Sequence, residues 1–306
     1  MTSRATFGAW LRAPIFMLLS LGILLMPALP TTVAAQDTEY QRFSVEVVGE
    51  GPDVILIPGL ATPRDVWLPT ARELASHYRL HLVQVKGFGE DAGINADGPV
   101  LAPMVEELAN YIEQEGLQKP AVVGHSMGGL AALMLGARHT DLPGKLMIVD
   151  AMPWFGVLAA PGQEVTMEMI EPQAAALRAG MIATYGQDLT PEQLAAQVQG
   201  QVLDPAHLPQ LMEWAGRADP RVAGQLAYDD LTTDMRQEIA TITAPVTVVF
   251  PWNETYPTLE QAEPFYRAQY AALPEVETVG VGAAGHFLML DQPGSFLQAL
   301  EDFLAQ

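Results

Sequence analysis

Residues 122–132 read VVGHSMGGLAA and place a single serine between an apolar run and a run of small residues. The apolar run is typical of a buried strand, and the small residues favour a helix close to that strand. Gly124 and Gly128 flank Ser126 at two residues' distance, which is the G-x-S-x-G pattern. A sharp strand-to-helix turn needs glycine there, because a Cβ would meet neighbouring backbone. The pattern therefore predicts a strained turn that presents Ser126 above a sheet edge.

A serine hydroxyl is a weak nucleophile at neutral pH, so Ser126 needs a base, a group that orients the base and donors for an oxyanion. The chain has six histidines. His286 follows a strand-like segment near the C-terminus and fits the chain order serine, acid, histidine. We interpret Ser126 as the nucleophile and His286 as the base. His125 is expected to support the turn, since adjacent residues on it point apart.

Strand-like and helix-like segments alternate from residue 40 onward, and the strand-like ones are apolar throughout. This alternation predicts an α/β fold with a mostly parallel sheet covered on both faces by helices. The expected strands lie at 42–49, 53–60, 80–90, 119–126, 145–153, 244–252 and 276–287, and the expected helices at 67–78, 104–116, 128–139 and 293–306.

The alternation stops in one long segment. Residues 154–240 read as mostly helical, with proline and glycine breaks and a mixed apolar and acidic content. We therefore predict one core domain, made of residues 36–153 and 241–306, with a helical insertion at 154–240.

Several motifs occur in the order typical of the α/β-hydrolase superfamily, and the chain from about Phe43 onward resembles that superfamily. The resemblance implies the α/β-hydrolase fold, with a helical lid inserted before the penultimate strands, and a Ser-His-acid triad. Relatives that act as dehalogenases or epoxide hydrolases need a carboxylate nucleophile, and Ser126 occupies that place here. The motifs are LIPGL at 56–60, VKGFG at 85–89, GHSMGG at 124–129 and GHFLMLDQP at 285–293.

The resemblance also suggests the groups that assist Ser126 and His286. The backbone N–H groups of Leu60 and Met127 are the expected oxyanion donors. Relatives carry the acid after the strand that follows the insertion, where Glu254 is the carboxylate, so Glu254 is the preferred acid. Asp150, at the end of the strand before the insertion, is the alternative.

The insertion is rich in methionine and aromatic residues, and some of these side chains are expected to line a pocket for an apolar ester or lactone. Trp154, Phe155 and Met169 are the candidates, although such residues also form the core of a lid. The expected activity is that of a serine hydrolase of the carboxylesterase or lipase type. Aminopeptidase, carbon–carbon hydrolase and cofactor-free peroxidase activities remain open, as does a binding protein without turnover.

The first 35 residues have the layout of a secretory signal. Arg4 and Arg12 precede an apolar run that ends in the small residues Val33, Ala34 and Ala35. Prolines interrupt that run, which leaves it short of the roughly 20 residues that a membrane-spanning helix needs. We therefore predict cleavage near Ala35 and a protein exported to the periplasm or the exterior. A retained anchor is the alternative.

Composition narrows the expected partners. The net charge is −21, and an acidic surface of this kind repels nucleic acid and anionic membranes. We therefore expect a small ester-like substrate, no nucleic-acid partner and no stable membrane association after cleavage. The chain has no cysteine, which excludes disulfides, thiolate metal sites and a cysteine nucleophile. No cofactor or metal is expected, and the oligomeric state stays open.

Overall fold

The computed structural model describes residues 36–160, 164–255, 257–273 and 275–306. The signal segment predicted over residues 1–35 lies outside these described residues.

Eight strands form one sheet in the order β1-β2-β4-β3-β5-β6-β7-β8. Each neighbouring pair from β4 to β8 is parallel, whereas β2 pairs antiparallel with both β4 and β1. The predicted mostly parallel sheet is therefore confirmed. The strands are β1 Gln36–Glu39, β2 Phe43–Val48, β3 Asp53–Ile57, β4 Arg79–Val85, β5 Ala121–His125, β6 Lys145–Val149, β7 Val246–Trp252 and β8 Glu277–Gly282.

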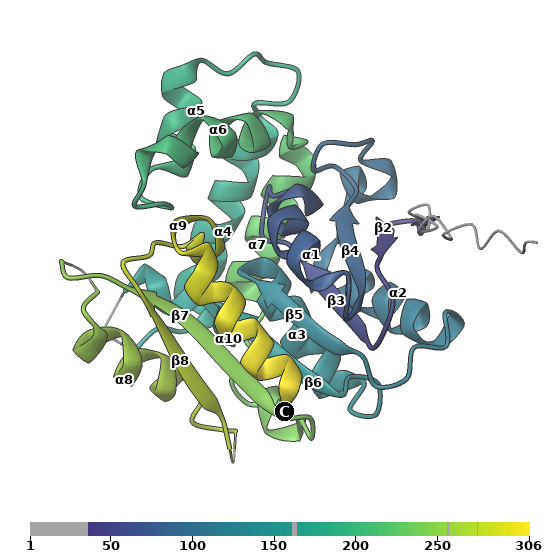
Figure 1. Cartoon of the computed structure of the whole chain (residues 1–306). Coiled ribbons are helices and arrows are strands. Elements are labelled where there is room, and N and C mark those ends of the chain that lie inside the picture. The colour runs from purple at the N-terminus through teal and green to yellow at the C-terminus, as the bar shows by residue number, and fades with distance from the viewer. Residues whose placement is uncertain (1–35, 161–163, 256, 274) are drawn as a thin grey trace, which may run out of the picture. The chain divides into compact units, whose positions relative to one another are not determined.

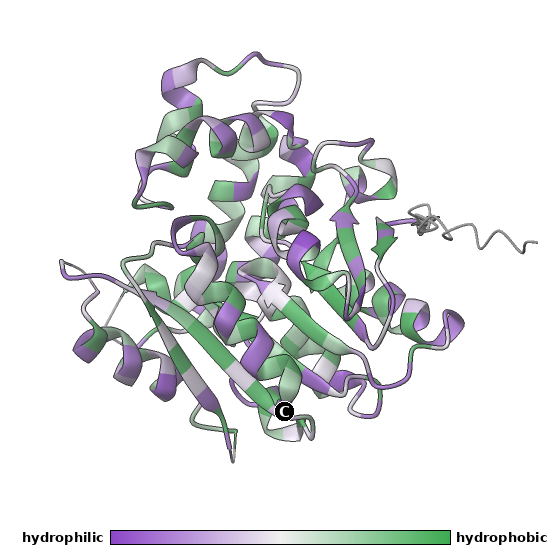
Figure 2. Ribbon diagram, in the orientation of Figure 1, coloured by the Kyte–Doolittle hydropathy of each residue, from purple (hydrophilic) through white to green (hydrophobic). Residues whose placement is uncertain are grey.

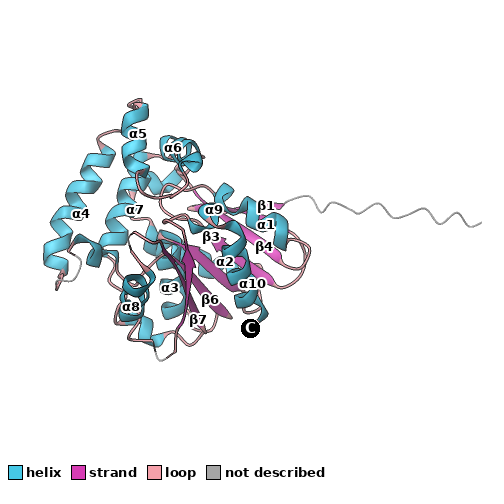
Figure 3. Ribbon diagram, turned by 60° about the vertical axis from the view of Figure 1, so that its left-hand side comes forward, coloured by secondary structure: helices cyan, strands magenta, loops and turns pink. Residues whose placement is uncertain are grey.

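Helices cover both faces of the sheet, because side chains along each buried strand point alternately to either side (Figure 3). Ile55 and Ile57 of β3 belong to the apolar cluster that contains side chains of α2, α3 and α8. Val54 and Leu56 belong to the cluster on the opposite face, which contains side chains of α1, α9 and α10. The two clusters make the strands the most apolar part of the molecule (Figure 2). The helices are α1 Leu68–Leu74, α2 Leu101–Gln114, α3 Met127–Arg138, α8 Leu259–Gln269, α9 Leu288–Asp291 and α10 Pro293–Ala305.

A helical segment connects β6 to β7, where the sequence interrupts its α/β alternation (Figure 1). Within it α4 packs along α7, and α5 packs on α6. Its elements are the 3₁₀ helices η3 Phe155–Ala159, η4 Pro205–His207 and η5 Glu238–Thr241, and the α-helices α4 Met167–Ile182, α5 Pro191–Val198, α6 Leu208–Arg217 and α7 Pro220–Thr232. We call residues 154–240 the inserted segment.

No helix in the described part of the chain is both long enough and apolar enough to span a bilayer.

Candidate active site

Ser126 lies between the end of β5 and the first residue of α3, in the left-handed region at φ 54° and ψ −121°. A Cβ on Gly124 would collide with the carbonyl of Gly128, and one on Gly128 would collide with the carbonyls of Ile57 and Pro58. The G-x-S-x-G spacing is therefore explained by sterics. The turn places Ser126 at the positive end of α3, which favours negative charge developing there.

Asp150 directly follows β6, and Ser126 directly follows the neighbouring strand β5. The N–H of Ser126 donates to the carbonyl of Val149 at 2.9 Å, and the N–H of Asp150 donates to the carbonyl of Val249 at 2.8 Å. These hydrogen bonds continue the ladders of β5, β6 and β7 by one residue. Both side chains consequently come from the carboxyl ends of adjacent parallel strands, where ligands of open α/β sheets bind.

His286 donates its Nδ1–H to Oδ2 of Asp150, with 2.5 Å between the two atoms. The Asp150 side chain is 11% exposed and that of His286 is 28% exposed. His286 and Ser126 line one cavity of about 380 Å³, together with the turn Gly59–Thr62 after β3. The imidazole of His286 thus bonds to a buried carboxylate on one side and lines the cavity of Ser126.

A second donor holds the same carboxylate. The hydroxyl of Tyr266, on α8, donates to Oδ1 of Asp150. Burial alone raises the pKa of Asp150, but the His286 charge and the hydrogen bonds from His286 and Tyr266 outweigh it and lower that pKa below its usual value. Burial, and then the charge of Asp150, raises the pKa of Tyr266 far above normal, so its hydroxyl keeps the proton that it donates. Nothing in the sequence pattern around Tyr266 indicated this contact.

His125 supports the loop that carries His286. Its ring is fully buried, and its Nε2 lies 2.9 Å from the backbone carbonyl of His286. Burial, reinforced by the charge of His286, lowers the pKa of His125 to about 3, so its ring is neutral at working pH. A carbonyl only accepts hydrogen bonds, which places the proton of His125 on Nε2. The supporting role predicted for His125 agrees with this geometry.

The structure does not bring Glu254 to His286, and the sequence-based preference for Glu254 over Asp150 is therefore corrected. Glu254 is exposed, in a turn beyond the end of β7 that closes through the Asn253 N–H and the Pro257 carbonyl at 2.9 Å. Asn253 Oδ1 also accepts the N–H of Thr255 at 2.8 Å. This turn leaves Glu254 on the surface, whereas Asp150 follows β6 directly and meets His286.

The turn after β3 approaches the nucleophile closely. A Cβ on Gly59 would lie 3.1 Å from Cβ of Ser126 and 3.0 Å from Nδ1 of His125. Leu60, one of the two predicted oxyanion donors, lines the same cavity as Ser126. Met127, the other, is the first residue of α3. Leu60 thus lies on the turn after β3, and Met127 directly follows Ser126.

None of the three residues predicted to line the substrate pocket lines the cavity of Ser126. Trp154 is fully buried and donates its Nε1–H to the carbonyl of Leu231 at 2.7 Å, which makes it part of the inserted segment's own core. Met169 is 49% exposed on α4. Phe155 lines a different cavity of about 520 Å³, on the Asp150 side of His286. Apolar composition could not tell which face of each helix meets Ser126.

The side chains that surround Ser126 come from other positions of the inserted segment. They belong to α4, α5, α6 and the segment between α5 and α6, and His286 and its neighbour complete the wall. The residues are Leu177, Met181, Gln197, Val198, Gln201, Leu211, Trp214, Ala215 and Phe287.

Asp291 joins the inserted segment to the loop of His286. Its carboxylate accepts the backbone N–H groups of Leu203 and Asp204 at 3.0 Å and that of Gly285 at 2.8 Å. The N–H of Phe287 adds a bond to the Gln201 carbonyl at 3.0 Å. Residues 200–204, which we call the connector, are thereby fixed to the residues on both sides of His286.

The described residues contain no group of three or more His, Asp or Glu side chains placed to hold a metal ion.

Comparison with known proteins identifies the family. The model of the alpha/beta hydrolase family matches residues 54–299, and the chain belongs to this family.

The chain is similar to individual proteins at lower sequence identity, as three of them show. A pimeloyl-[acyl-carrier protein] methyl ester esterase of Aeromonas salmonicida is 29% identical over 269 residues, which are 85% of this chain and 98% of that protein. An esterase structure from Exiguobacterium antarcticum has a TM-score of 0.72 at 21% identity, covering 89% of this chain and 100% of that one. The enol-lactonase structure from Burkholderia xenovorans has a TM-score of 0.68 at 19% identity, covering 86% and 96%.

Proposed function

We propose that this protein is a serine hydrolase that cleaves the ester or lactone bond of a small, rather apolar substrate. Ser126 is the nucleophile, His286 the base and Asp150 the orienting acid. The hydrogen bond from His286 to Asp150, beside the cavity that His286 shares with Ser126, is the observation that supports it most directly. The esterase names of the curated relatives support the substrate class.

In the acylation step, Nε2 of His286 takes the proton of the Ser126 hydroxyl while the oxygen attacks the ester carbonyl carbon. The carbonyl oxygen becomes an oxyanion and is stabilised by the N–H groups of Leu60 and Met127. Asp150 holds the Nδ1 proton of His286 and stabilises the imidazolium that forms. When the tetrahedral intermediate collapses, the imidazolium returns a proton to the leaving alkoxide, which departs as an alcohol.

Deacylation repeats these roles with water. His286 removes a proton from a water molecule, and the resulting hydroxide attacks the acyl carbon bonded to Ser126. Collapse of the second intermediate breaks the bond to Ser126, which regains its proton from His286. The products are a carboxylic acid and the free enzyme.

Labelling by a fluorophosphonate and a substrate screen together test this function. The screen covers p-nitrophenyl esters, lactones and aminoacyl anilides, so that the ester and lactone classes compete with aminopeptidase activity. We expect stoichiometric labelling and turnover of esters or lactones in preference to anilides. A folded protein that neither reacts with the probe nor turns over any substrate is instead a hydrolase-like binding protein.

We also propose that the protein acts outside the cytoplasm, on the basis of the basic, apolar and small-residue layout of its first 35 residues. Mass spectrometry of the protein from the native host is expected to give an N-terminus near Gln36 in the soluble exported fraction. An intact Met1 terminus in the membrane fraction would show an anchor instead of a cleaved signal.

Tyr266→Phe should lower kcat roughly ten- to a hundredfold with little change in KM. The variant removes the hydroxyl that donates to Asp150 but keeps the ring, which stacks on Phe250 at 4.9 Å between centroids. Hydrogen bonds to charged groups contribute about 1.5–3 kcal/mol, and each 1.36 kcal/mol of barrier changes a rate about tenfold. Steady-state kinetics on one ester measures the effect.

The matched control is Tyr270→Phe, at the position directly after the same helix. The Tyr270 hydroxyl is also buried, but it donates to the backbone carbonyl of Ala151, at 2.9 Å, and not to the carboxylate. We expect its kcat to fall less than tenfold. Equal losses in the two variants, matched by equal losses of melting temperature, would assign Tyr266 a purely structural role.

A further inference from the structure

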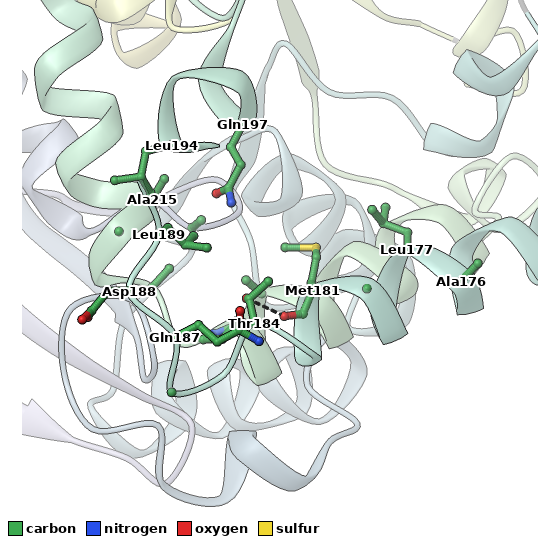
Figure 4. Close-up of a pocket in the computed structure, with 17 residues that line it drawn as sticks. Ala176, Leu177, Met181, Thr184, Gln187, Asp188, Leu189, Leu194, Gln197 and Ala215 are labelled. Carbon is green, nitrogen blue, oxygen red and sulfur yellow. Dashed lines mark hydrogen bonds between the residues drawn. The ribbon is translucent and has the colours of Figure 1, made fainter. Parts of the chain in front are cut away.

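The cavity that holds Ser126 adjoins a groove of about 660 Å³ on the inserted segment. Five residues line both hollows, so the groove begins directly beside the cavity. Figure 4 shows that side chains of α4 lie on one side of the groove and those of α5 and α6 on the other. The shared residues are Ala61, Leu177, Met181, Gln197 and Ala215.

The side chains that line the groove are mostly small and uncharged, which suits a neutral chain. Asp188 is the one ionisable side chain among the described residues that line it, and it lies in the turn between α4 and α5. The α4 wall near the junction alternates small residues with the apolar side chains of Leu177 and Met181. Leu177 is 46% exposed and so presents apolar surface to the groove. The small lining residues are Ala61, Ala176, Gly180, Gly186, Ala215, Gly216, Ala218 and Ala223.

The position of the groove, beside the turn after β3 and away from His286, indicates that it receives the acyl side of an ester. The leaving oxygen must face His286 to receive its proton, and the carbonyl oxygen must face the turn after β3. The acyl chain then points away from His286. The groove contains Ala61 of that turn but is not lined by His286, so it begins on the acyl side of the reacting carbon.

We propose that this groove binds an unbranched, uncharged acyl chain of medium to long length, whose carbonyl carbon is the one attacked by Ser126. The proposal rests on the proposed function, because the groove matters to catalysis only if Ser126 reacts with the ester. It assigns the acyl chain to a particular wall of this protein, between α4 on one side and α5 and α6 on the other.

The test varies one side of the ester at a time. One series carries acyl chains from acetyl to tetradecanoyl on p-nitrophenol, and the other carries alcohols of increasing length on acetate. Burial contributes about 0.8 kcal/mol per methylene, so kcat/KM should rise roughly two- to fourfold per methylene in the acyl series. The alcohol series should change far less. A steeper dependence on the alcohol chain would overturn the assignment.

Gly180→Phe places a ring in the groove. A Cβ on Gly180 has no heavy atom within 4 Å, so the substitution fills open space without a clash in α4. The ratio of kcat/KM for dodecanoate to that for acetate should fall at least tenfold, and Gly180→Leu should give an intermediate ratio.

Gly294→Phe is the matched control, because Gly294 lies in α10, has equally open surroundings and lines neither hollow. Its ratio should equal that of the unmodified enzyme. A ratio unchanged in Gly180→Phe, with acetate still hydrolysed, would overturn the acyl groove alone. Absence of turnover on every ester, acetate included, would overturn the proposed function and this inference with it.

Discussion

Ser126→Ala is expected to lower kcat on a good ester by about 10⁶-fold, the loss typical of removing a serine nucleophile. Without the hydroxyl, no acyl-enzyme can form, and only the oxyanion donors and substrate binding remain to accelerate attack by water. Alanine can occupy the same left-handed conformation as Ser126 at a similar cost, since both residues carry a Cβ. We therefore expect an intact fold, which circular dichroism and the melting temperature will report.

The loss of activity should be matched by loss of fluorophosphonate labelling at residue 126, read by peptide mass spectrometry. Ser76→Ala is the matched control. The exposed Ser76 hydroxyl lies 2.8 Å from Nδ1 of His77, so it also forms a serine–histidine pair, but one that is not part of the cavity around Ser126. Full labelling and activity are expected in Ser76→Ala. A folded Ser126→Ala protein that retained its activity would refute the mechanism.

Asp150→Asn is expected to lower kcat on the order of 10⁴-fold. The asparagine amide cannot stabilise the imidazolium, and its NH₂ group favours the wrong tautomer of His286. The variant also loses the charge-assisted hydrogen bond that His286 now donates to the Asp150 carboxylate at 2.5 Å. Steady-state kcat on one good ester measures the loss.

Glu254→Gln distinguishes the two acids, because it makes the same chemical change on the exposed turn after β7. We expect its kcat to stay within about twofold of the unmodified enzyme, since surface changes away from the site have small effects. The opposite ranking of the two variants would return the orienting role to Glu254. Two mild losses would show that another group orients His286.

The sequence ranked Asp150 second to Glu254 for a physical reason. Ser126 and His286 could be singled out because their signals are local: two glycines fix the turn of Ser126, and a strand end precedes His286. Asp150 and Glu254 both follow strands and both fit the chain order. The choice between them depends on where the loop of His286 comes to rest, and that is set by contacts distant in sequence. The Asn253 turn that exposes Glu254 was visible only in the structure.

The side chains that line the cavity of Ser126 were not predicted for a related reason. The strands from β2 to β8 could be predicted because a buried strand is rich in apolar residues. A helix of the inserted segment has several possible inner faces, and composition does not choose among them. Trp154 is large and apolar, yet a carbonyl 77 residues further along fixes its indole within the segment. Ala215 and Gln197, which line the cavity, carry no comparable signal.

The bonds made by Asp291 have a consequence for protein engineering. Helical insertions of this kind look like exchangeable parts, which could be transplanted between enzymes to change specificity. Here the connector supplies the N–H groups of Leu203 and Asp204, and a third comes from Gly285, next to His286. A transplanted insertion that lacked a matching connector would leave Asp291 without two of these three partners and would weaken the support of the loop that carries His286. The inserted segment and the residues around His286 would therefore have to be transplanted together, although the two regions lie far apart in the sequence.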